Sequence, residues 1–435
     1  MDINPIVLSI PIYFLLIGIE LIVQFVQKKK LYRLNDAFAN IGCGITQQIS
    51  GLFFKILVVA AYQFFYEYFA IMQVPVNAWT IALLFVLADF CYYWAHRMSH
   101  EVNLFWGGHM VHHQSEDYNL SVALRQGSFQ VVWTFIFYLP LAVLGFDTLT
   151  FVTVSAFVTL YQFWIHTETI GKLGWLEYIF NTPSHHRVHH GRDPKYIDKN
   201  HAGVFIIWDR MFGTFQEEEE KPTYGVTQPV DTWNPIWANI KPYAAMAQQI
   251  KATPKWSDRL KVLYKKPGWR PDYQGGYQSP PDVDKQQYLK YDAKGDSTLQ
   301  YYIFFQFAIA LVGTAFFLFS AGSMAIGEKL SAAGLILLSL ISLGSLFENA
   351  RKTVPIEVIR LAFTVMLVLY LGNQSAWVGT FLGTSIVYFL VSVLWLFSGT
   401  NRKSTMPPVE LIKSSMETAA VDTGNQKKWV ETQKQ

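Results

Sequence analysis

The residues of this chain that are best suited to chemistry are its histidines. All eleven lie between positions 96 and 201 of a sequence of 435 residues, and the rest of the chain has none. In chain order they are His96 and His100, then His109, His112 and His113, then His166, then His185, His186, His189 and His190, and finally His201. Imidazole binds Zn, Cu, Fe and Ni, so this clustering predicts a metal site without naming the metal.

The spacing within the motifs favours two metal ions. On a helix, His96 and His100 share one face about one turn apart. His112 and His113 are adjacent and cannot share a helical face, and the third cluster repeats this arrangement. Gly107-Gly108 between the first two motifs is expected to reorient the chain. More than four imidazoles also argue for two ions rather than one.

We predict that the ten histidines from His96 to His190 bind the metal, with His185 alternatively acting as a partner of a ligand. His201 lies beyond the repeated pattern and is left out of the ligand set. Asp89 precedes His96 by seven residues, on nearly the same helical face, so we expect its carboxylate to accept the second N–H of a ligating imidazole. Glu101 is expected to do the same for His100, and the alternatives are a salt link to Arg97 or solvation.

Apolar residues make up 51% of the sequence and charged residues 15%, and the apolar residues occur in long runs. A helix needs about 20 mostly apolar residues to cross a bilayer core of about 30 Å. We therefore predict an all-α, polytopic membrane protein with about nine transmembrane helices and a histidine-rich di-metal cap on the cytoplasmic side. The predicted spans are Ile6–Val26, Ser50–Ile71, Trp79–Trp94, Phe129–Leu144, Leu149–Ile165, Tyr301–Ser320, Leu330–Leu346, Val354–Leu371 and Trp377–Phe397.

The same runs divide the chain into three regions. Residues 1–296 are predicted to form a membrane domain whose cytoplasmic cap carries the histidine motifs at 96–201. Residues 297–400 would form a four-helix membrane block without histidine, and residues 401–435 a polar tail that is predicted to be disordered.

Orientation follows from the basic residues, because short loops rich in Lys and Arg stay in the cytoplasm. Lys28, Lys29, Lys30 and Arg33 directly follow the first span. Placing them inside puts the N-terminus outside and brings every histidine motif and the C-terminus to the cytoplasmic side. The net charge of +3 is too small and too scattered to suggest a nucleic-acid partner.

The histidine motifs and the text around them resemble the membrane fatty acid hydroxylase and sterol desaturase superfamily. The resemblance covers roughly residues 80–215 and includes Asp89-Phe90, the stretch 181–192 and the stretch 199–215. The phrases His100-Glu101, His166-Thr167-Glu168 and Trp208-Asp209-Arg210, with four further spans downstream, are most similar to members that oxidise alkylglycerols.

This resemblance implies two non-haem iron ions that activate O2 at the cytoplasmic surface of the membrane and oxidise a C–H bond of a lipid. With an ether lipid, hydroxylation beside the ether oxygen gives a hemiacetal, which collapses to a fatty aldehyde and a glycerol derivative. The resemblance also implies tetrahydrobiopterin as the reductant. The electron donor must be a separate molecule, because no histidine pair remains for a fused cytochrome domain and no G-x-G-x-x-G motif is present.

Two other functions stay open at this point. One is a sterol, carotenoid or fatty-acyl hydroxylase or desaturase that uses a protein electron donor, with the same metal centre and a different pocket. The other is a metal transporter, which is disfavoured because transporters usually place their ligands at the middle of the membrane, whereas these histidines lie at span ends and in a cytoplasmic segment.

Overall fold

The computed structural model describes residues 5–292, 296–372 and 378–400. These residues form helices and no β-strand apart from two isolated bridges, which confirms the all-α prediction for the described part of the chain. The predicted disorder of residues 401–435 and the start of the last predicted span at Trp377 lie outside the described residues. The α-helices are α1 (Pro5–Gln27), α2 (Leu34–Phe69), α3 (Ala78–Glu101), α4 (Asn103–His113), α5 (Gln130–Thr134), α6 (Leu139–Leu144), α7 (Thr148–Tyr161), α8 (Pro183–His189), α9 (Ile207–Phe212), α10 (Pro235–Ala252), α11 (Trp256–Tyr264), α12 (Ser297–Ser320), α13 (Ile326–Gly372) and α14 (Val378–Thr400).

Six helical stretches among the described residues are long and apolar enough to cross a membrane, where the sequence predicted nine spans. They are Leu8–Gln27, Ala78–Glu101, Ser297–Ser320, Ile326–Asn349, Arg351–Gly372 and Gly379–Thr400. The fourth and fifth both belong to α13, which turns at Asn349, where the backbone leaves the helical conformation. These six stretches correspond to the predicted spans at 6–26, 79–94, 301–320, 330–346, 354–371 and 377–397.

The other three predicted spans are not confirmed as single crossing helices. The run 129–144 breaks into α5, a short 3-10 helix and α6, and α7 has 14 residues. At 1.5 Å per residue, a helix of that length reaches about 21 Å, less than the bilayer core. The run 50–71 belongs to α2, whose two halves, Leu34–Phe54 and Ile56–Phe69, are inclined by 45° and qualify as a seventh crossing only if taken together.

Gly145 shows why α6 ends where it does. Its φ of 98° is left-handed, and a Cβ at this position would lie 1.9 Å from the carbonyl oxygen of Met72. Only glycine meets both requirements. The turn is held by two backbone hydrogen bonds, from Ile71 to Val143 and from Val74 to Gly145. The end of α2 and the end of α6 are thereby joined at the side of the molecule away from the histidines.

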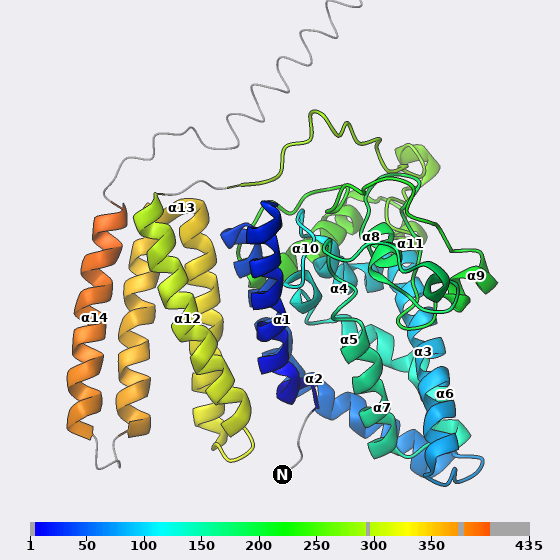
Figure 1. Ribbon diagram of the computed structural model, residues 1–435, viewed down its shortest axis with the longest axis horizontal. Helices are drawn as coiled ribbons and strands as arrows, with labels where there is room; N and C mark the ends of the chain where they lie inside the picture. The colour runs from blue at the N-terminus through cyan, green and yellow to red at the C-terminus, as the bar shows by residue number, and fades with distance from the viewer. Residues whose placement is uncertain (1–4, 293–295, 373–377, 401–435) are drawn as a thin grey trace, which may run out of the picture.

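Two hydrophobic cores organise the helices. One joins α2, α12, α13 and α14, with Phe38 of α2 packing edge-on against Phe307 of α12 at a ring separation of 4.7 Å. The other joins the far half of α2 to α3, α6 and α7, with Tyr62 stacked on Phe151. In Figure 1, α12, α13 and α14 stand beside α1, and the helices that carry histidines lie on its other side. The helix α2 belongs to both cores and connects the two halves.

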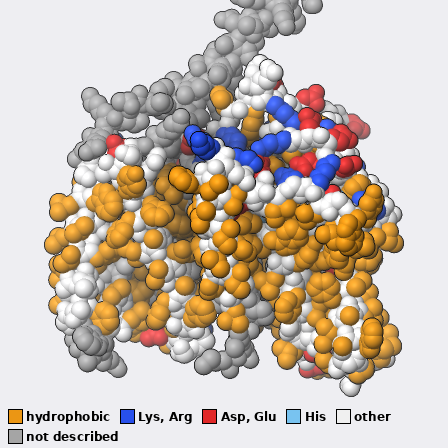
Figure 2. Space-filling view, in the orientation of Figure 1, with side chains coloured by type: hydrophobic (Ala, Val, Ile, Leu, Met, Phe, Trp, Pro, Cys, Tyr) orange, Lys and Arg blue, Asp and Glu red, His pale blue; other side chains and the backbone are white. Residues whose placement is uncertain are grey.

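Charged side chains gather at one end of the molecule (Figure 2), over the region of α8 to α11 in Figure 1. The sides below this end are covered mainly by hydrophobic side chains, as expected for a surface that faces lipid. Lys28, Lys29 and Lys30, at the end of α1, are exposed.

Candidate metal centre

The structure gathers nine histidines into two adjacent groups. We call the set His96, His100, His109, His113 and His189 the first group, and the set His112, His166, His186 and His190 the second group. Within each group, one ligand atom from every member lies within 4.8 Å of the others, and all nine side chains are buried. Segments that are more than ninety residues apart in sequence, such as those of His96 and His189, therefore meet at one place.

Helical geometry explains how the motifs divide between the groups. Residues four apart lie on the same helix face, so His109 and His113 of α4 both face the first group. Their neighbour His112 projects about 100° away and enters the second group. In the same way His189, at the end of α8, joins the first group, and His190 joins the second. The pairs His112-His113 and His189-His190 thus each supply one imidazole to each group.

The predicted change of chain direction at Gly107-Gly108 is not found there. Both glycines lie inside the continuous helix α4, and the chain instead changes direction at Val102, between α3 and α4. The glycines are needed for close packing, because a Cβ on Gly107 would lie 2.8 Å from the ring of Tyr243.

The ring nitrogens within each group lie at distances that fit a shared ion. His109 Nε2 is 2.9 Å from His96 Nε2 and 3.0 Å from His113 Nε2. In the second group, His166 Nε2 is 3.2 Å from His112 Nε2 and 2.9 Å from His186 Nε2. Two imidazoles bound at right angles with bonds of about 2.1 Å would place their nitrogens about 3.0 Å apart.

Several ring nitrogens are buried without a hydrogen-bond partner in the described part of the chain. These are Nε2 of His100, His189 and His190. An unpaired buried polar atom costs about 1–3 kcal/mol. A metal ion in each group would satisfy these atoms, so the donor set fits the metal that the sequence predicts.

Backbone carbonyls orient four of the rings. A carbonyl oxygen can only accept, so each ring nitrogen that contacts one must carry the proton, which leaves the lone pair on Nε2. The Nδ1–H donors and their acceptors are His96 to His201 O at 2.7 Å, His112 to Arg125 O at 2.7 Å, His166 to Gln162 O at 2.7 Å and His189 to Lys199 O at 2.9 Å. These four imidazoles are held in the tautomer that a metal requires.

Burial also keeps the imidazoles neutral. It lowers the pKa of His112 to about 4. Burial, reinforced by the neighbouring imidazoles, lowers the pKa of His113 and His190 well below the usual value of a histidine. Neutral imidazole is the form that binds a metal.

The structure gives Asp89 a different role from the predicted one. Its carboxylate accepts hydrogen bonds from the backbone N–H of Val204 at 2.7 Å and of Phe205 at 3.0 Å, and from the indole of Trp208 at 2.9 Å. These contacts replace the expected hydrogen bond to an imidazole. Asp89 therefore acts on the segment that follows His201 rather than on a ligand ring.

Glu101 forms the salt link to Arg97 that the sequence analysis gave as an alternative. It accepts a hydrogen bond from Arg97 Nε at 3.0 Å, one helical turn back. The carboxylate nearest to the His100 ring belongs instead to Asp198, whose Oδ1 is 3.4 Å from His100 Nδ1.

Asp209 is a positioning residue to which the sequence assigned no role. It is fully buried, and its two oxygens accept the backbone N–H groups of His201 and Ala202, each at 2.8 Å. The hydroxyl of Thr214 donates to the same carboxylate at 2.7 Å. The carbonyl of His201 accepts a hydrogen bond from His96 Nδ1. By holding the backbone at His201, Asp209 therefore orients the imidazole of His96 without contacting it.

The two remaining histidines lie outside the groups. His185 precedes His186 on α8 and projects to another side of the helix, where its ring lies 5.4 Å from that of Phe215. Its prediction as a ligand is not supported by this placement. His201 is buried with its ring 5.0 Å from that of His100, and among the described residues neither of its ring nitrogens has a hydrogen-bond partner.

The loop after α4 orients the second group. Arg125 accepts from His112 through its carbonyl, and its guanidinium donates to Val111 O at 2.7 Å and to Gln114 Oε1 at 2.6 Å. Gly127 allows the loop to lie against α4, because a Cβ there would be 1.8 Å from the carbonyl oxygen of Gly108.

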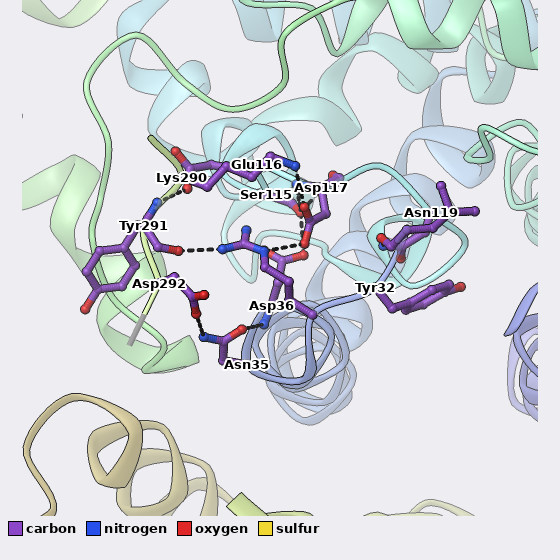
Figure 3. A network of polar contacts seen from close by, with 12 residues as sticks. Tyr32, Asn35, Asp36, Ser115, Glu116, Asp117, Asn119, Lys290, Tyr291 and Asp292 are labelled. Carbon is purple, nitrogen blue, oxygen red and sulfur yellow. Dashed lines mark hydrogen bonds and ion pairs between the residues drawn. The ribbon is translucent and has the colours of Figure 1, made fainter. Parts of the chain in front are cut away.

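A polar network ties this loop to α2 and to the chain that leads into α12 (Figure 3). Asp117 accepts from Arg33 Nε at 2.7 Å and from Lys290 Nζ at 2.6 Å. Asn35, near the start of α2, donates to Asp292 Oδ1 at 2.7 Å. Residues from three distant parts of the sequence are therefore fastened together beside the metal centre.

A cavity of about 1040 Å³ begins at the histidines. His109, His112 and His166 form part of its wall, and most of the remaining wall comes from apolar side chains of α1, α2, α7 and α12. The arrangement can therefore hold a long apolar molecule with one part beside the two groups.

Comparison with known proteins agrees with this arrangement. Residues 81–214 match the sequence model of the fatty acid hydroxylase family. A search of the solved structures gave no significant match.

Among curated proteins, the chain is 39% identical over 361 residues to alkylglycerol monooxygenase of Xenopus tropicalis, covering 82% of this chain and 80% of that protein. It is 39% identical to alkylglycerol monooxygenase of Homo sapiens over 361 residues, covering 82% and 81%. A Delta(7)-sterol 5(6)-desaturase of Gibberella zeae is 27% identical over 147 residues, covering 32% of this chain and 38% of that protein. The extent of the first two matches shows that the chain belongs to the alkylglycerol monooxygenase family. It is a multi-pass integral membrane protein of an oxidoreductase family.

Proposed function

We propose that this chain is a membrane-bound di-iron monooxygenase that hydroxylates the carbon beside the ether oxygen of an alkylglycerol. The observation that carries the proposal is the pair of adjacent groups of buried, neutral imidazoles at the end of a largely apolar cavity. The similarity to alkylglycerol monooxygenases supports the choice of substrate.

The nitrogen ligands of both groups are compatible with iron. When bound there, two ferrous ions would supply the activation of O2 and the oxidation of an unactivated C–H bond. The residues of the chain provide the tautomers, the burial and the spacing that two ions require. Asp89 and Asp209 would fix the segment whose carbonyl orients His96, and Arg125 would fix the loop that orients His112.

The cavity would place the substrate and keep water away from it. Its apolar walls take the alkyl tail, and the wall formed by His109, His112 and His166 then faces the ether end of the tail. One atom of O2 enters the C–H bond, and the other leaves as water, with two electrons and two protons from a reductant. The resulting hemiacetal loses its C–O bond to give a fatty aldehyde and a glycerol derivative.

The electrons would come from a separate donor, for which we propose tetrahydrobiopterin by analogy with the family. We place the histidine end and the C-terminus in the cytoplasm and the N-terminus outside. The exposed Lys28, Lys29 and Lys30, which directly follow α1, support this orientation.

One alternative has support of its own. The similarity to a sterol desaturase over about a third of the chain favours a sterol or fatty-acyl hydroxylase or desaturase with a protein electron donor as the second candidate. A metal transporter is not favoured, since the relatives named above are oxidoreductases.

The test uses the purified protein in lipid nanodiscs with ferrous iron, O2 and a labelled alkylglycerol, with or without reduced pterin. Aldehyde that forms only with pterin supports the proposal, and oxidation of a sterol or acyl lipid in its place selects the alternative. His112→Ala and His189→Ala, one from each group, should abolish turnover and lower the iron content. His185→Ala is the matched control, because it removes a buried imidazole that lies outside both groups. Full activity and unchanged iron in both ligand variants would refute the assignment.

A further inference from the structure

The cavity has one wall that lies far from the histidine region in sequence. Leu311, Thr314, Ala315 and Leu318 of α12 line it, although the match to the fatty acid hydroxylase family ends at residue 214. Their spacing of three and four residues places them on one face of the helix, over about 10 Å of its length. The C-terminal helices therefore contribute to the same cavity as the histidines.

This face of α12 suits a hydrocarbon chain. Three of the four residues are aliphatic, and the hydroxyl of Thr314 donates to the carbonyl of Ala310 at 2.7 Å, so it has no unused proton to offer a ligand. A polar headgroup would find no free side-chain donor among these four residues and only the Thr314 oxygen as an acceptor. The chemistry of the wall instead fits the tail of a lipid.

The position of α1 indicates where a lipid can enter. Ile10, Tyr13 and Phe14 of α1 line the same cavity as α12, and α1 stands beside α12 in Figure 1. The buried side chains of α1 pack with Phe163 and Leu120, whereas those of α12 pack with α2, α13 and α14. The two helices thus belong to separate cores, and both line the cavity. Val312 both lines the cavity and is 71% exposed, so this wall continues to the lipid-facing surface.

The polar network of Figure 3 and the packing of α12 itself connect the C-terminal region to the part of the chain that carries the histidines. Lys290 and Asp292, a few residues before α12 begins at Ser297, are bonded to Asp117 and Asn35. Phe307 of α12 packs against α2 further along the helix. The wall is therefore packed against α2, which also lines the cavity.

We propose that α12 is the specificity element of this enzyme: its face at Leu311 to Leu318 receives the alkyl tail of the substrate, which enters from the bilayer between α1 and α12. The proposal rests on the proposed function in taking an alkylglycerol as the occupant. It assigns to the C-terminal helices a direct role in substrate choice.

The first experiment changes the wall. Ala315→Trp and Leu318→Trp should lower kcat/KM for a long-chain alkylglycerol by at least about tenfold, because the added ring fills space that the tail needs. Turnover of a short-chain alkylglycerol should change little. Phe316→Trp is the matched control, since Phe316 is on the same helix, 63% exposed and outside the cavity. An unchanged chain-length preference in both cavity variants would overturn the proposal.

The second experiment is independent of turnover and of folding in the variants. An alkylglycerol with a photoreactive diazirine at the end of its alkyl chain is irradiated with the wild-type protein in nanodiscs without reductant. Adducts on the 311–318 segment should fall at least tenfold with excess unlabelled alkylglycerol, whereas adducts on the lipid-facing Leu394 of α14, which is 72% exposed, should not.

The two proposals can fail separately. Competed adducts on α12 without oxidation of alkylglycerol would support the tail site while refuting the proposed reaction. Oxidation of alkylglycerol without competed adducts on α12 would support the reaction and overturn the assignment of α12.

Discussion

Replacing Asp209 by asparagine is expected to weaken metal binding at the first group without changing any ligand. Burial raises the pKa of Asp209 to about 6, so at neutral pH it is a carboxylate that accepts from all three of its donors. The amide of asparagine keeps one oxygen but turns an NH2 toward the backbone N–H of either His201 or Ala202. One charge-assisted hydrogen bond is lost, and two donors then face each other.

The size of the effect follows from these contacts. A hydrogen bond to a charged group contributes about 1.5–3 kcal/mol, and a buried N–H left unpaired costs about 1–3 kcal/mol. We expect the free energy of unfolding to fall by about 3 kcal/mol. The carbonyl of His201 would also move, which releases the Nδ1–H of His96 and should lower the affinity for the first ion about 10- to 100-fold.

The assay is a titration of the purified protein with ferrous iron against a competing chelator, with stability measured in parallel. Asp258→Asn is the control, because Asp258 is also buried and accepts from Tyr273 at 3.0 Å but lies on α11, outside both histidine groups. We expect one of the two ions to bind more weakly in Asp209→Asn, and both ions to keep the wild-type affinity in the control. Two ions of wild-type affinity in Asp209→Asn would refute the positioning role.

Three further changes test other parts of the structure. Gly127→Ala should lower both stability and the iron content of the second group, because the new Cβ would lie 1.8 Å from the carbonyl of Gly108; thermal unfolding and metal analysis would show it. Burial lowers the pKa of His185 to about 4, below the unfolded value of 6.5, so the stability that its neutral form contributes is present above pH 6.5 and lost as the pH falls toward 4. His185→Asn should therefore lose about 3 kcal/mol less than the wild type on acidification over this range, as measured by denaturant unfolding of the metal-free protein. Arg360→Leu should cost about 3–5 kcal/mol by leaving the fully buried Glu357 without its ion-pair partner, and adding Glu357→Gln should recover part of this loss.

The division of the histidines into two groups could be predicted from sequence because it depends only on helical geometry. Residues four apart share a face and adjacent residues do not, and this holds wherever the helix lies in the fold. The assignments of His112 and His113 to different groups follow directly. His185 shows the limit of the argument, since a histidine inside the motif can still project away from the metal centre.

The orienting contacts could not be predicted in the same way. Four rings are held by backbone carbonyls, which have no residue type to search for. Asp89 was recognised as significant, but its partners Val204 and Phe205 are more than a hundred residues away and present only backbone N–H groups. Pairing of this kind is decided by the tertiary fold.

The predicted number of nine spans is not confirmed for a related reason. Apolar runs at 129–144 and 149–165 have the composition of crossing helices, yet they form short helices that line the cavity together with α12. Hydrophobicity indicates that a segment avoids water, and it does not distinguish contact with bilayer lipid from contact with a lipid inside the protein. Short helices around a cavity and a distant helix that completes its wall are both expected of a protein that takes its substrate from the membrane. On this argument the three unconfirmed spans and α12 have a common explanation, since all of them contribute to the largely apolar cavity beside the histidines.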